Sequence, residues 1–275
     1  MNIPYYIADA FTDQVFHGNP AGICIPEHPL SDSTMQAIAK ENNLSETAFL
    51  SKIQSANKQI AEYQIRWFTP EGEIDLCGHA TLASAFILTS FIETDTDCIR
   101  FHSPSGILNV RKKGTEFEME FPVRSWQPLP AASQYNQMIG CTPSEIYIGR
   151  DLFLVLDHAS QVANAKPDFA YMKTQQDQSD WLGVVITAPG DSNYVCDFVS
   201  RYFCPELNIH EDPVTGSSHC NLIPYWSQRL HKPILTAMQI SQRGGILNCE
   251  YPSSESKIVK IRGKATLYLK GDLII

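Results

Sequence analysis

The chain has 275 residues, 43% of them hydrophobic and 19% charged, which is the composition of a folded globular protein rather than a disordered one. Its formal net charge of −9 argues against a nucleic-acid partner, because such a surface needs clustered Lys and Arg to displace counterions. No secretory signal opens the sequence, and the longest apolar run, 82–92, is shorter than the ~20 residues of a membrane span. We therefore expect a cytoplasmic protein with no nucleic-acid or membrane partner.

Taken in chain order, the hydrophobic pattern predicts more strands than helices. The first part is expected to contain strand 3–9, helix 31–42, strands 46–51 and 62–67, helix 78–90, and strands 98–103, 107–112 and 116–121. The second part is expected to contain strand 146–156, helices 160–165 and 168–174, strands 183–188 and 194–203, helix 216–230, and strands 238–241, 246–250, 258–262 and 265–269. Strands with interspersed helices, without regular alternation of the two, predict an α+β fold.

A proline-rich segment divides the chain near its midpoint. Three prolines interrupt both helix and strand there, so we expect a linker at 122–133 between domains 1–121 and 134–275, the last strand being able to pair back to the first domain. RWFTPE at 66–71 recurs as RYFCPE at 201–206, and each copy is followed by a loop and a glycine that opens a helix. This repeat predicts a duplication, with two similar domains related by a pseudo-twofold axis.

The eight cysteines and eight histidines show no spacing typical of a disulfide framework or of a metal site. No C-x-x-C pair and no H-E-x-x-H motif is present, and glycine-rich nucleotide-binding motifs are also missing. TGSSH does not match the G-x-S-x-G nucleophile elbow of serine hydrolases. We therefore expect reduced, mostly buried thiols, and neither a metal nor a cofactor.

Two predicted helix starts carry small residues and titratable groups. Gly78 and Gly216 would let a ligand approach the backbone, where the first N–H groups of a helix attract a carboxylate. The same small residues would equally serve the tight packing of two central helices. The neighbouring titratable groups are Cys77 and His79 at the first start, and Glu211, Asp212 and His219 at the second.

The chemistry available at these starts is that of acids and bases. A carboxylate in a cleft with little water has its pKa raised from ~4 toward neutrality, and it can then remove a proton and return it elsewhere. Cys77 and His79 are two residues apart on an emerging helix, so we do not expect them to face each other.

Six motifs carry a resemblance to a known family. They are ADAFTDQVFHGNPAG (8–22), NLSETAFL (43–50), IRWFTPEGEIDLCGHATLASA (65–85), HSPSG-L-V (102–110), DFVSRYFCPELNIHEDPVTGSSHC (197–220) and SQRGG (241–245). With these motifs the sequence resembles the phenazine-biosynthesis-like (PhzF-like) isomerase family, within the diaminopimelate epimerase-like superfamily. The resemblance implies two domains, each a curled mixed β-sheet or barrel around a central helix, and an isomerase that needs neither cofactor nor metal.

The resemblance also assigns the site residues. Glu46 becomes the group that removes and redelivers a proton, a role that a lone Glu in a strand would not have indicated. His79 and Asp212 would adjust the pKa of Glu46 and hold the substrate, and Ser217 would bind a carboxylate or an enolate oxygen. The remaining substrate-binding positions are Gly18, Asn19, Gly78, Gly216 and Ser218, the last standing where the family commonly has Ala.

Three functions remain open at this stage. The favoured one is a cofactor-independent isomerase, of the proton-shift or epimerase type, that acts on a small carboxylic acid. The second is a non-catalytic carboxylate-binding or scaffold protein that retains the cleft. The third, a two-thiol racemase using Cys77, lacks its second cysteine, because EDPVTG has none before Gly216. The family's members are often dimers, so a homodimer is expected by resemblance.

Overall fold

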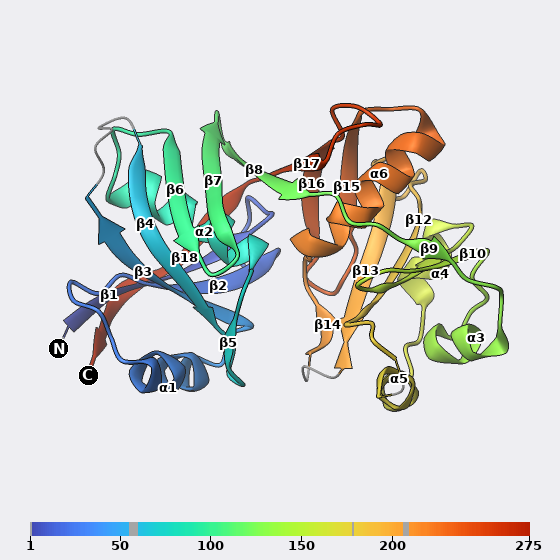
Figure 1. Cartoon of the computed structure of the whole chain (residues 1–275), viewed down its shortest axis with the longest axis horizontal. Helices are drawn as coiled ribbons and strands as arrows, with labels where there is room; N and C mark the ends of the chain where they lie inside the picture. The colour runs from blue at the N-terminus through green and yellow to red at the C-terminus, as the bar shows by residue number, and fades with distance from the viewer. Residues whose placement is uncertain (1, 55–59, 178, 206–208) are drawn as a thin grey trace. The chain divides into compact units, whose positions relative to one another are not determined.

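The computed structural model describes residues 2–54, 60–177, 179–205 and 209–275, and the chain divides into two compact units (Figure 1). Unit 1 comprises Met1–Glu120 and Lys260–Ile275, and unit 2 comprises Phe121–Val259. Unit 1 is therefore built from two segments that lie far apart in the sequence. Whether the units are independently folding domains joined by a linker at 122–133 stays a prediction.

Unit 1 is a mixed sheet with one helix inside it and one outside. Its elements are β1 (Asn2–Ala10), β2 (Asn19–Cys24), α1 (Asp32–Asn42), β3 (Glu46–Ile53), β4 (Ala61–Phe68), β5 (Glu73–Ile74), α2 (Gly78–Phe91), β6 (Cys98–Ser103), β7 (Gly106–Lys113), β8 (Glu116–Pro122) and β18 (Ala265–Ile274). The main strand order is β18-β1-β2-β3-β4-β6-β7-β8, in which the β2–β3 and β4–β6 pairs are parallel and the other pairs antiparallel.

Helix α2 contains no Asp, Glu, Lys or Arg, and nearly all of its side chains are buried. A helix that is apolar or small on every side must be surrounded by protein. It packs against strands from both ends of the sheet, β18 and β7 among them, so the sheet curls around it. Its hydroxyls bond within the helix: Thr81 Oγ1 donates to the Cys77 carbonyl at 2.6 Å, and Ser84 Oγ to the Ala80 carbonyl at 2.7 Å.

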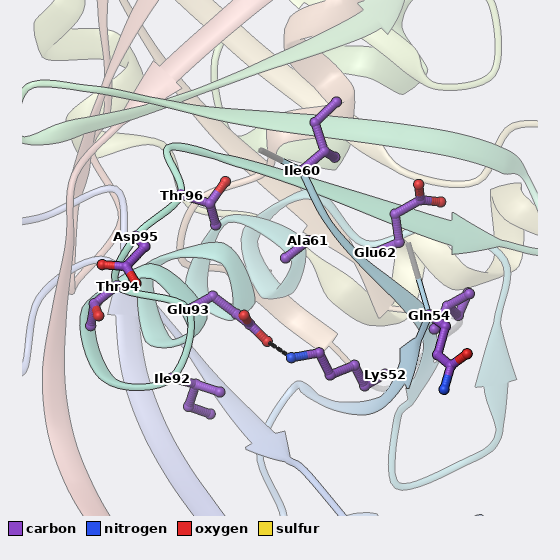
Figure 2. Close-up of a pocket in the computed structure, with 11 residues that line it drawn as sticks. Lys52, Gln54, Ile60, Ala61, Glu62, Ile92, Glu93, Thr94, Asp95 and Thr96 are labelled. Atoms are coloured by element: carbon purple, nitrogen blue, oxygen red, sulfur yellow. Dashed lines mark hydrogen bonds and ion pairs between the residues drawn. The ribbon is translucent and has the colours of Figure 1, made fainter. Parts of the chain in front are cut away.

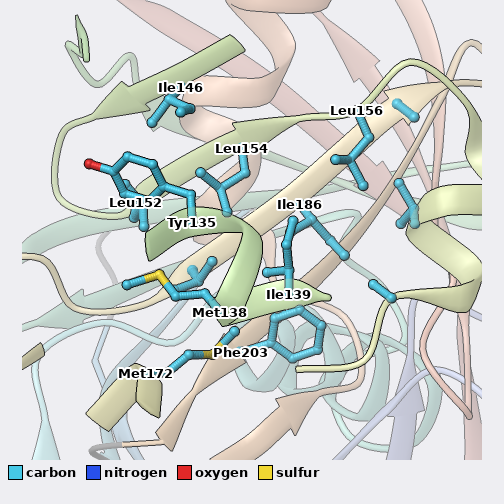
Figure 3. Packing of buried hydrophobic residues seen from close by; sticks show 14 of the residues in the cluster. Tyr135, Met138, Ile139, Ile146, Leu152, Leu154, Leu156, Met172, Ile186 and Phe203 are labelled. Atoms are coloured by element: carbon cyan, nitrogen blue, oxygen red, sulfur yellow. The ribbon is translucent and has the colours of Figure 1, made fainter. Parts of the chain in front are cut away.

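Unit 2 has the same kind of construction. Its elements are β9 (Gln127–Pro128), α3 (Ser133–Ile139), β10 (Glu145–Ile148), β11 (Leu152–Val155), α4 (Ala159–Asn164), α5 (Phe169–Gln176), β12 (Val184–Pro189), β13 (Phe198–Cys204), β14 (Ile209–Asp212), the 3₁₀ turn η2 (Gly216–Ser218), α6 (His219–Leu230), β15 (Ile234–Gln239), β16 (Gly245–Glu250) and the start of β17 (Ile258–Gly263), whose remaining residues belong to unit 1. Helices α3, α4 and α5 cover one face of its sheet, where Met138, Ile139 and Met172 pack with Ile186 and Phe203 (Figure 3).

The two units repeat one order of strand pairing. In unit 1 the sequence of pairs β1–β2, β2–β3, β3–β4 and β4–β6 is antiparallel, parallel, antiparallel, parallel. In unit 2 the pairs β10–β11, β11–β12, β12–β13 and β13–β15 follow the same order. This agreement supports the duplication that the repeated hexapeptide predicts.

The repeated arginine makes the same contacts in each unit. Nε and Nη2 of Arg66 donate to the two carboxylate oxygens of Glu73, both at 2.6 Å, and its guanidinium lies 5.1 Å from the centre of the Phe68 ring. Arg201 donates in the same way to Glu211 at 2.7 and 2.9 Å, and its guanidinium lies 5.1 Å from the Phe203 ring. In both copies, the arginine of the hexapeptide makes a cation–π contact with the phenylalanine of the hexapeptide and a bidentate ion pair with a glutamate that follows it.

Most predicted elements are present, and the differences have physical causes. Strand β2 was not predicted, because its Asn-Pro-Ala-Gly start is typical of a turn. The expected strand 146–156 is a hairpin, β10 and β11, that turns at Gly149 to Asp151. Residues 216–230 begin with the tighter η2 turn, and α6 starts only at His219. In the described ranges, no helix is long and apolar enough to cross a membrane.

Candidate active site

Three residues meet where elements of unit 1 begin. Glu46 is the first residue of β3, Asn19 is the first residue of the neighbouring strand β2, and His79 is the second residue of α2. His79 Nε2 lies 3.1 Å from Glu46 Oε2, and the side chains are only 6% and 11% exposed. His79 Nδ1 lies 3.2 Å from Asn19 Nδ2. The structure thus brings three residues of the predicted site into one buried cluster.

The loop before Asn19 has a tightly specified backbone. Gly18 has a φ of 63°, and a Cβ at this position would lie 2.1 Å from the carbonyl oxygen of Ala10. Phe11 and Phe16 also have positive φ values, 64° and 71°, which bulky residues rarely adopt. The buried carboxylate of Asp9 accepts a hydrogen bond from the Phe16 N–H at 2.9 Å. The position of Asn19 therefore depends on a strained loop, a feature that often accompanies a functional site.

Cys77 faces His79, and the expectation that these two side chains would point apart was wrong. Cys77 is the N-cap of α2 and has an extended backbone, with φ −139° and ψ 108°, so helical spacing does not apply to it. Its Sγ lies 3.5 Å from His79 Nδ1. Burial, together with the negative charge of Glu46, raises the pKa of the Cys77 thiol. At neutral pH the thiol therefore keeps its proton, which makes it a poor base.

The surroundings of His79 raise the pKa of its imidazole. Burial lowers the pKa of this imidazole, but Cys77 and Glu46 both raise it, and the balance lies well above the usual value. Since the Cys77 thiol is protonated at neutral pH, Glu46 is the partner that favours a proton on His79 there. The cluster thus places a carboxyl group and an imidazole in contact, beside a neutral thiol.

In unit 2, the loop around Asp212 is fixed by one buried amide. Gln239 Nε2 donates to the Asp212 carbonyl at 2.7 Å, and its Oε1 accepts from the Thr215 N–H at 2.8 Å. Thr215 Oγ1 donates a short hydrogen bond to the Asp212 carboxylate. Ser241, from the SQRGG motif, donates to the Pro213 carbonyl at 2.8 Å. The residues of two resemblance motifs thus hold Asp212 in place.

The serines at the second helix start differ in what their hydroxyls do. Ser217 Oγ accepts a hydrogen bond from Arg150 Nη2 at 3.0 Å. Ser218 is buried and donates to the Thr215 carbonyl at 2.9 Å, so its predicted part in ligand binding would fall to its backbone N–H. His219 is also buried, and burial lowers its pKa to about 4, which leaves a neutral imidazole at pH 7. Sequence reasoning missed Arg150, which lies 67 positions from Ser217.

Comparison with known proteins places the chain in a family. A family model described as phenazine biosynthesis-like protein matches residues 8–271. The chain belongs to this phenazine biosynthesis-like family. An uncharacterized isomerase of Pseudomonas aeruginosa is 40% identical over 273 residues, covering 99% of both chains. The phenazine biosynthesis-like domain-containing protein of Homo sapiens is 36% identical over 288 residues, again covering 99% of both.

Solved structures of the phenazine biosynthesis-like family and of epimerases share its fold. A PhzF-family protein from Enterococcus faecalis is 46% identical, with a TM-score of 0.91 and full coverage of both chains. A hydroxyproline epimerase from Agrobacterium vitis has a TM-score of 0.60 at 10% identity, covering 99% of this chain and 91% of that one. The predicted diaminopimelate epimerase-like α+β fold is confirmed.

One donor set of this family member could hold a metal ion. Single ligand atoms of Glu46, Cys77 and His79 all lie within 4.8 Å of one another, and sulfur, nitrogen and oxygen together suit zinc. At neutral pH, however, Cys77 and His79 each carry the proton that a metal would have to displace. Metal binding to this cluster would therefore release protons.

A hollow in unit 1 lies away from these residues. It has a volume of about 540 Å³ and lies between the end of β3, the start of β4 and the turn after α2 (Figure 2). Lys52 and Glu93 form an ion pair across it. Lys52 is six residues beyond Glu46 on β3, which at ~3.3 Å per residue is about 20 Å. This hollow is therefore separate from the candidate active site.

Proposed function

We propose that this member of the phenazine biosynthesis-like family is an isomerase that moves a proton on a small carboxylic acid, with Glu46 as its acid and base and with no cofactor. The observation that carries the proposal is the buried contact between Glu46 and His79 at the start of α2. The name of the Pseudomonas aeruginosa relative, an uncharacterized isomerase, supports the reaction class.

In the proposed reaction, the Glu46 carboxylate takes a proton from the carbon beside the substrate carboxylate. The C–H bond breaks, its electron pair passes into an enolate, and the proton moves to Glu46. Glu46 then returns the proton to another carbon, or to the other face of the same carbon. The positive charge of His79, 3.1 Å from Glu46, stabilises the negative charge that is present in each state.

Both helix starts lack a side-chain N-cap bond. Neither Cys77 at α2 nor Thr215 at η2 makes a side-chain cap bond, although both are N-cap residues. When the N-cap side chain does not bind the first N–H groups of a helix, these groups can bind a carboxylate instead. Gly78 and Gly216 would let a ligand approach the backbone, and we propose that Asp212 and Ser217 also take part in the reaction.

A hydrogen-exchange assay tests the role of Glu46. Wild-type protein is incubated in D2O with a panel of small amino and hydroxy acids, and loss of C–H signals is followed by proton NMR. The Glu46→Gln variant should exchange roughly 10²-fold to 10⁴-fold more slowly, the usual contribution of general acid–base catalysis. The exposed Glu71 provides the matched control, and Glu71→Gln should exchange at the wild-type rate.

The same assay separates the alternatives. Equal exchange by wild type and Glu46→Gln would remove Glu46 from the mechanism. An acid that binds tightly to wild type, as a thermal shift would show, but never exchanges would favour the non-catalytic binding protein.

A further inference from the structure

The donor atoms of Glu46, Cys77 and His79 are spaced much like the ligands of one metal ion. In a tetrahedral zinc site, with bonds of about 2.0–2.1 Å to nitrogen and about 2.3 Å to sulfur, neighbouring ligand atoms lie about 3.3–3.6 Å apart. His79 Nε2 lies 3.1 Å from Glu46 Oε2 and 4.0 Å from Cys77 Sγ, and single donor atoms of the three residues all lie within 4.8 Å of one another. Side-chain shifts of about 1 Å would therefore give three corners of a tetrahedron.

The Glu46 carboxylate has an oxygen that a cation can use. Oε2 is buried and has no hydrogen-bond partner among the described residues, although His79 Nε2 lies 3.1 Å away. A buried carboxylate oxygen without a hydrogen bond is costly, and a bound cation removes that cost. Two donor atoms that are in contact without a hydrogen bond between them can both coordinate one ion.

The charges of this donor set suit a divalent cation. One carboxylate and one thiolate carry two negative charges, which balance Zn²⁺ when the imidazole is neutral. As the Zn–S and Zn–N bonds form, the proton of the Cys77 thiol and any proton on His79 Nε2 pass to water. The product carries no net charge, so the cost of burying it is small.

Asn19 is placed to orient the imidazole toward such an ion. Its Nδ2 lies 3.2 Å from His79 Nδ1, and a half-turn of the amide puts the oxygen at that position instead. Asn19 would then accept a hydrogen bond from Nδ1–H and leave the lone pair of Nε2 for the metal, as the outer partners of ligating histidines do. Gly78, between the two donors of α2, is partly exposed, so the cluster lies next to the solvent.

We propose that Glu46, Cys77 and His79 bind Zn²⁺, with water as the fourth ligand, and that the bound ion inhibits the protein. A thiolate and an imidazole favour zinc over magnesium and calcium, which prefer oxygen ligands. The ion inhibits because it holds the Glu46 carboxylate that would otherwise take the proton of the substrate. The inhibition, unlike the binding, rests on the proposed function. Zinc is then a regulator of the site and not a cofactor.

The alternative is that the three residues serve proton transfer alone. Metal ions would then bind only to scattered surface groups, and Cys77 would not contact them. The two ideas therefore differ in whether the Cys77 sulfur coordinates the metal.

Cobalt(II) is the probe, because a thiolate bound to Co²⁺ gives an intense charge-transfer band in the near ultraviolet. Chelator-treated wild type is titrated with Co²⁺, and the band should saturate at one ion per chain. Zn²⁺ should then abolish the band, because it binds such donors more tightly than Co²⁺ does, whereas Mg²⁺ should leave it unchanged. Cys77→Ser should lose the band, and Asn19→Ala should bind Co²⁺ at least tenfold more weakly. The matched control is Cys98→Ser, which removes a partly exposed thiol of unit 1 and should titrate like wild type.

The zinc site is overturned if wild type gives no charge-transfer band, if Mg²⁺ abolishes the band, or if Cys98→Ser loses it. It is also overturned if Cys77→Ser keeps the band. Glu46→Gln provides a second variant in case circular dichroism shows that Cys77→Ser does not fold. It keeps the thiol and should need at least tenfold more Co²⁺ to saturate the band, and an affinity equal to wild type would overturn the site.

The deuterium-exchange assay tests the inhibition separately. Saturating Zn²⁺ should slow exchange by wild type at least tenfold, and a chelator should restore the rate. Exchange at the full rate with zinc bound would overturn the inhibition. Binding of Co²⁺ and Zn²⁺ without exchange in any acid would overturn the proposed function and leave the zinc site standing.

Discussion

The two copies of the repeated arginine allow one substitution to be made in two environments. Arg66 and Arg201 make the same contacts to a glutamate and a phenylalanine, but the Arg66 side chain is 26% exposed and that of Arg201 is 13% exposed. Replacing each arginine with methionine removes the charge and keeps most of the apolar stem. The structure predicts that Arg201→Met is the more costly change.

The magnitudes follow from what each substitution leaves behind. After Arg66→Met, Glu73 and the exposed Asp32 return to water, so the loss is roughly 1 kcal/mol, as for surface ion pairs. After Arg201→Met, Glu211 keeps a largely buried charge, and the carbonyls of Val162 and Ala165, which accept from Nη1 at 3.2 Å, lose that donor. The expected loss is about 3–5 kcal/mol, the range for breaking a buried pair.

Urea unfolding followed by tryptophan fluorescence measures both variants against wild type. A change of midpoint at constant slope reports stability alone. The reasoning is refuted if Arg66→Met costs as much as Arg201→Met, because burial would then not decide the strength of the pair.

Three further predictions concern the candidate active site. In an NMR titration, the imidazole of His79 should remain charged through pH 6.5, because its pKa is raised. The stability that this charge contributes is complete below pH ~6.5 and should decline as the pH rises through the raised pKa. A titration of His79 near pH 6.5 would contradict the ion pair with Glu46. Gly18→Ala should destabilise the protein by about 2–4 kcal/mol in thermal unfolding, because its Cβ would contact Ala10. The control Gly114→Ala has a similar φ of 65° but open space around its Cβ position, and it should cost only about 1–2 kcal/mol. Equal losses would show that the contact with Ala10 is unimportant. Cys77→Ser should keep the rate of proton exchange within roughly tenfold of wild type, and iodoacetamide should react slowly with the buried thiol. If Cys77→Ser slowed exchange as much as Glu46→Gln does, the hypothesis of a thiol racemase would be favoured again.

Elements with a clear period could be predicted from the sequence. Strand β4 alternates Tyr63, Ile65 and Trp67 with polar residues, and α2 lacks Asp, Glu, Lys and Arg, so pattern alone located both. Strand β2 escaped prediction because Pro and Gly weaken its pattern, while its neighbours β1 and β3 supply the pairing that makes it a strand. Local propensity cannot report such long-range pairing.

The candidate site could be predicted only in part. Gly78, His79 and Asp212 stand out beside predicted helix starts, but Glu46 looks like any solvated acid of a strand until β3 places it against His79. The contact of Cys77 with His79 depends on one extended residue before α2, which spacing rules for helices do not describe. The link from Arg150 to Ser217 depends on the arrangement of β10, β11 and η2 and leaves no mark in either local sequence.

The pairing of β1 with β18 affects the order in which the two units fold during synthesis. Every residue from Asn2 to Ala10 is opposite a residue of 265–274, so the β1–β18 pair cannot form until β18 has been synthesised. Unit 2 is contiguous, and we predict that it folds while translation continues. The Glu46–His79 pair belongs to unit 1, which is complete only after Lys260–Ile275 has been synthesised. A nascent or prematurely terminated chain should therefore carry an ordered second half beside an unfinished first one, and chaperones would meet the half that holds Glu46.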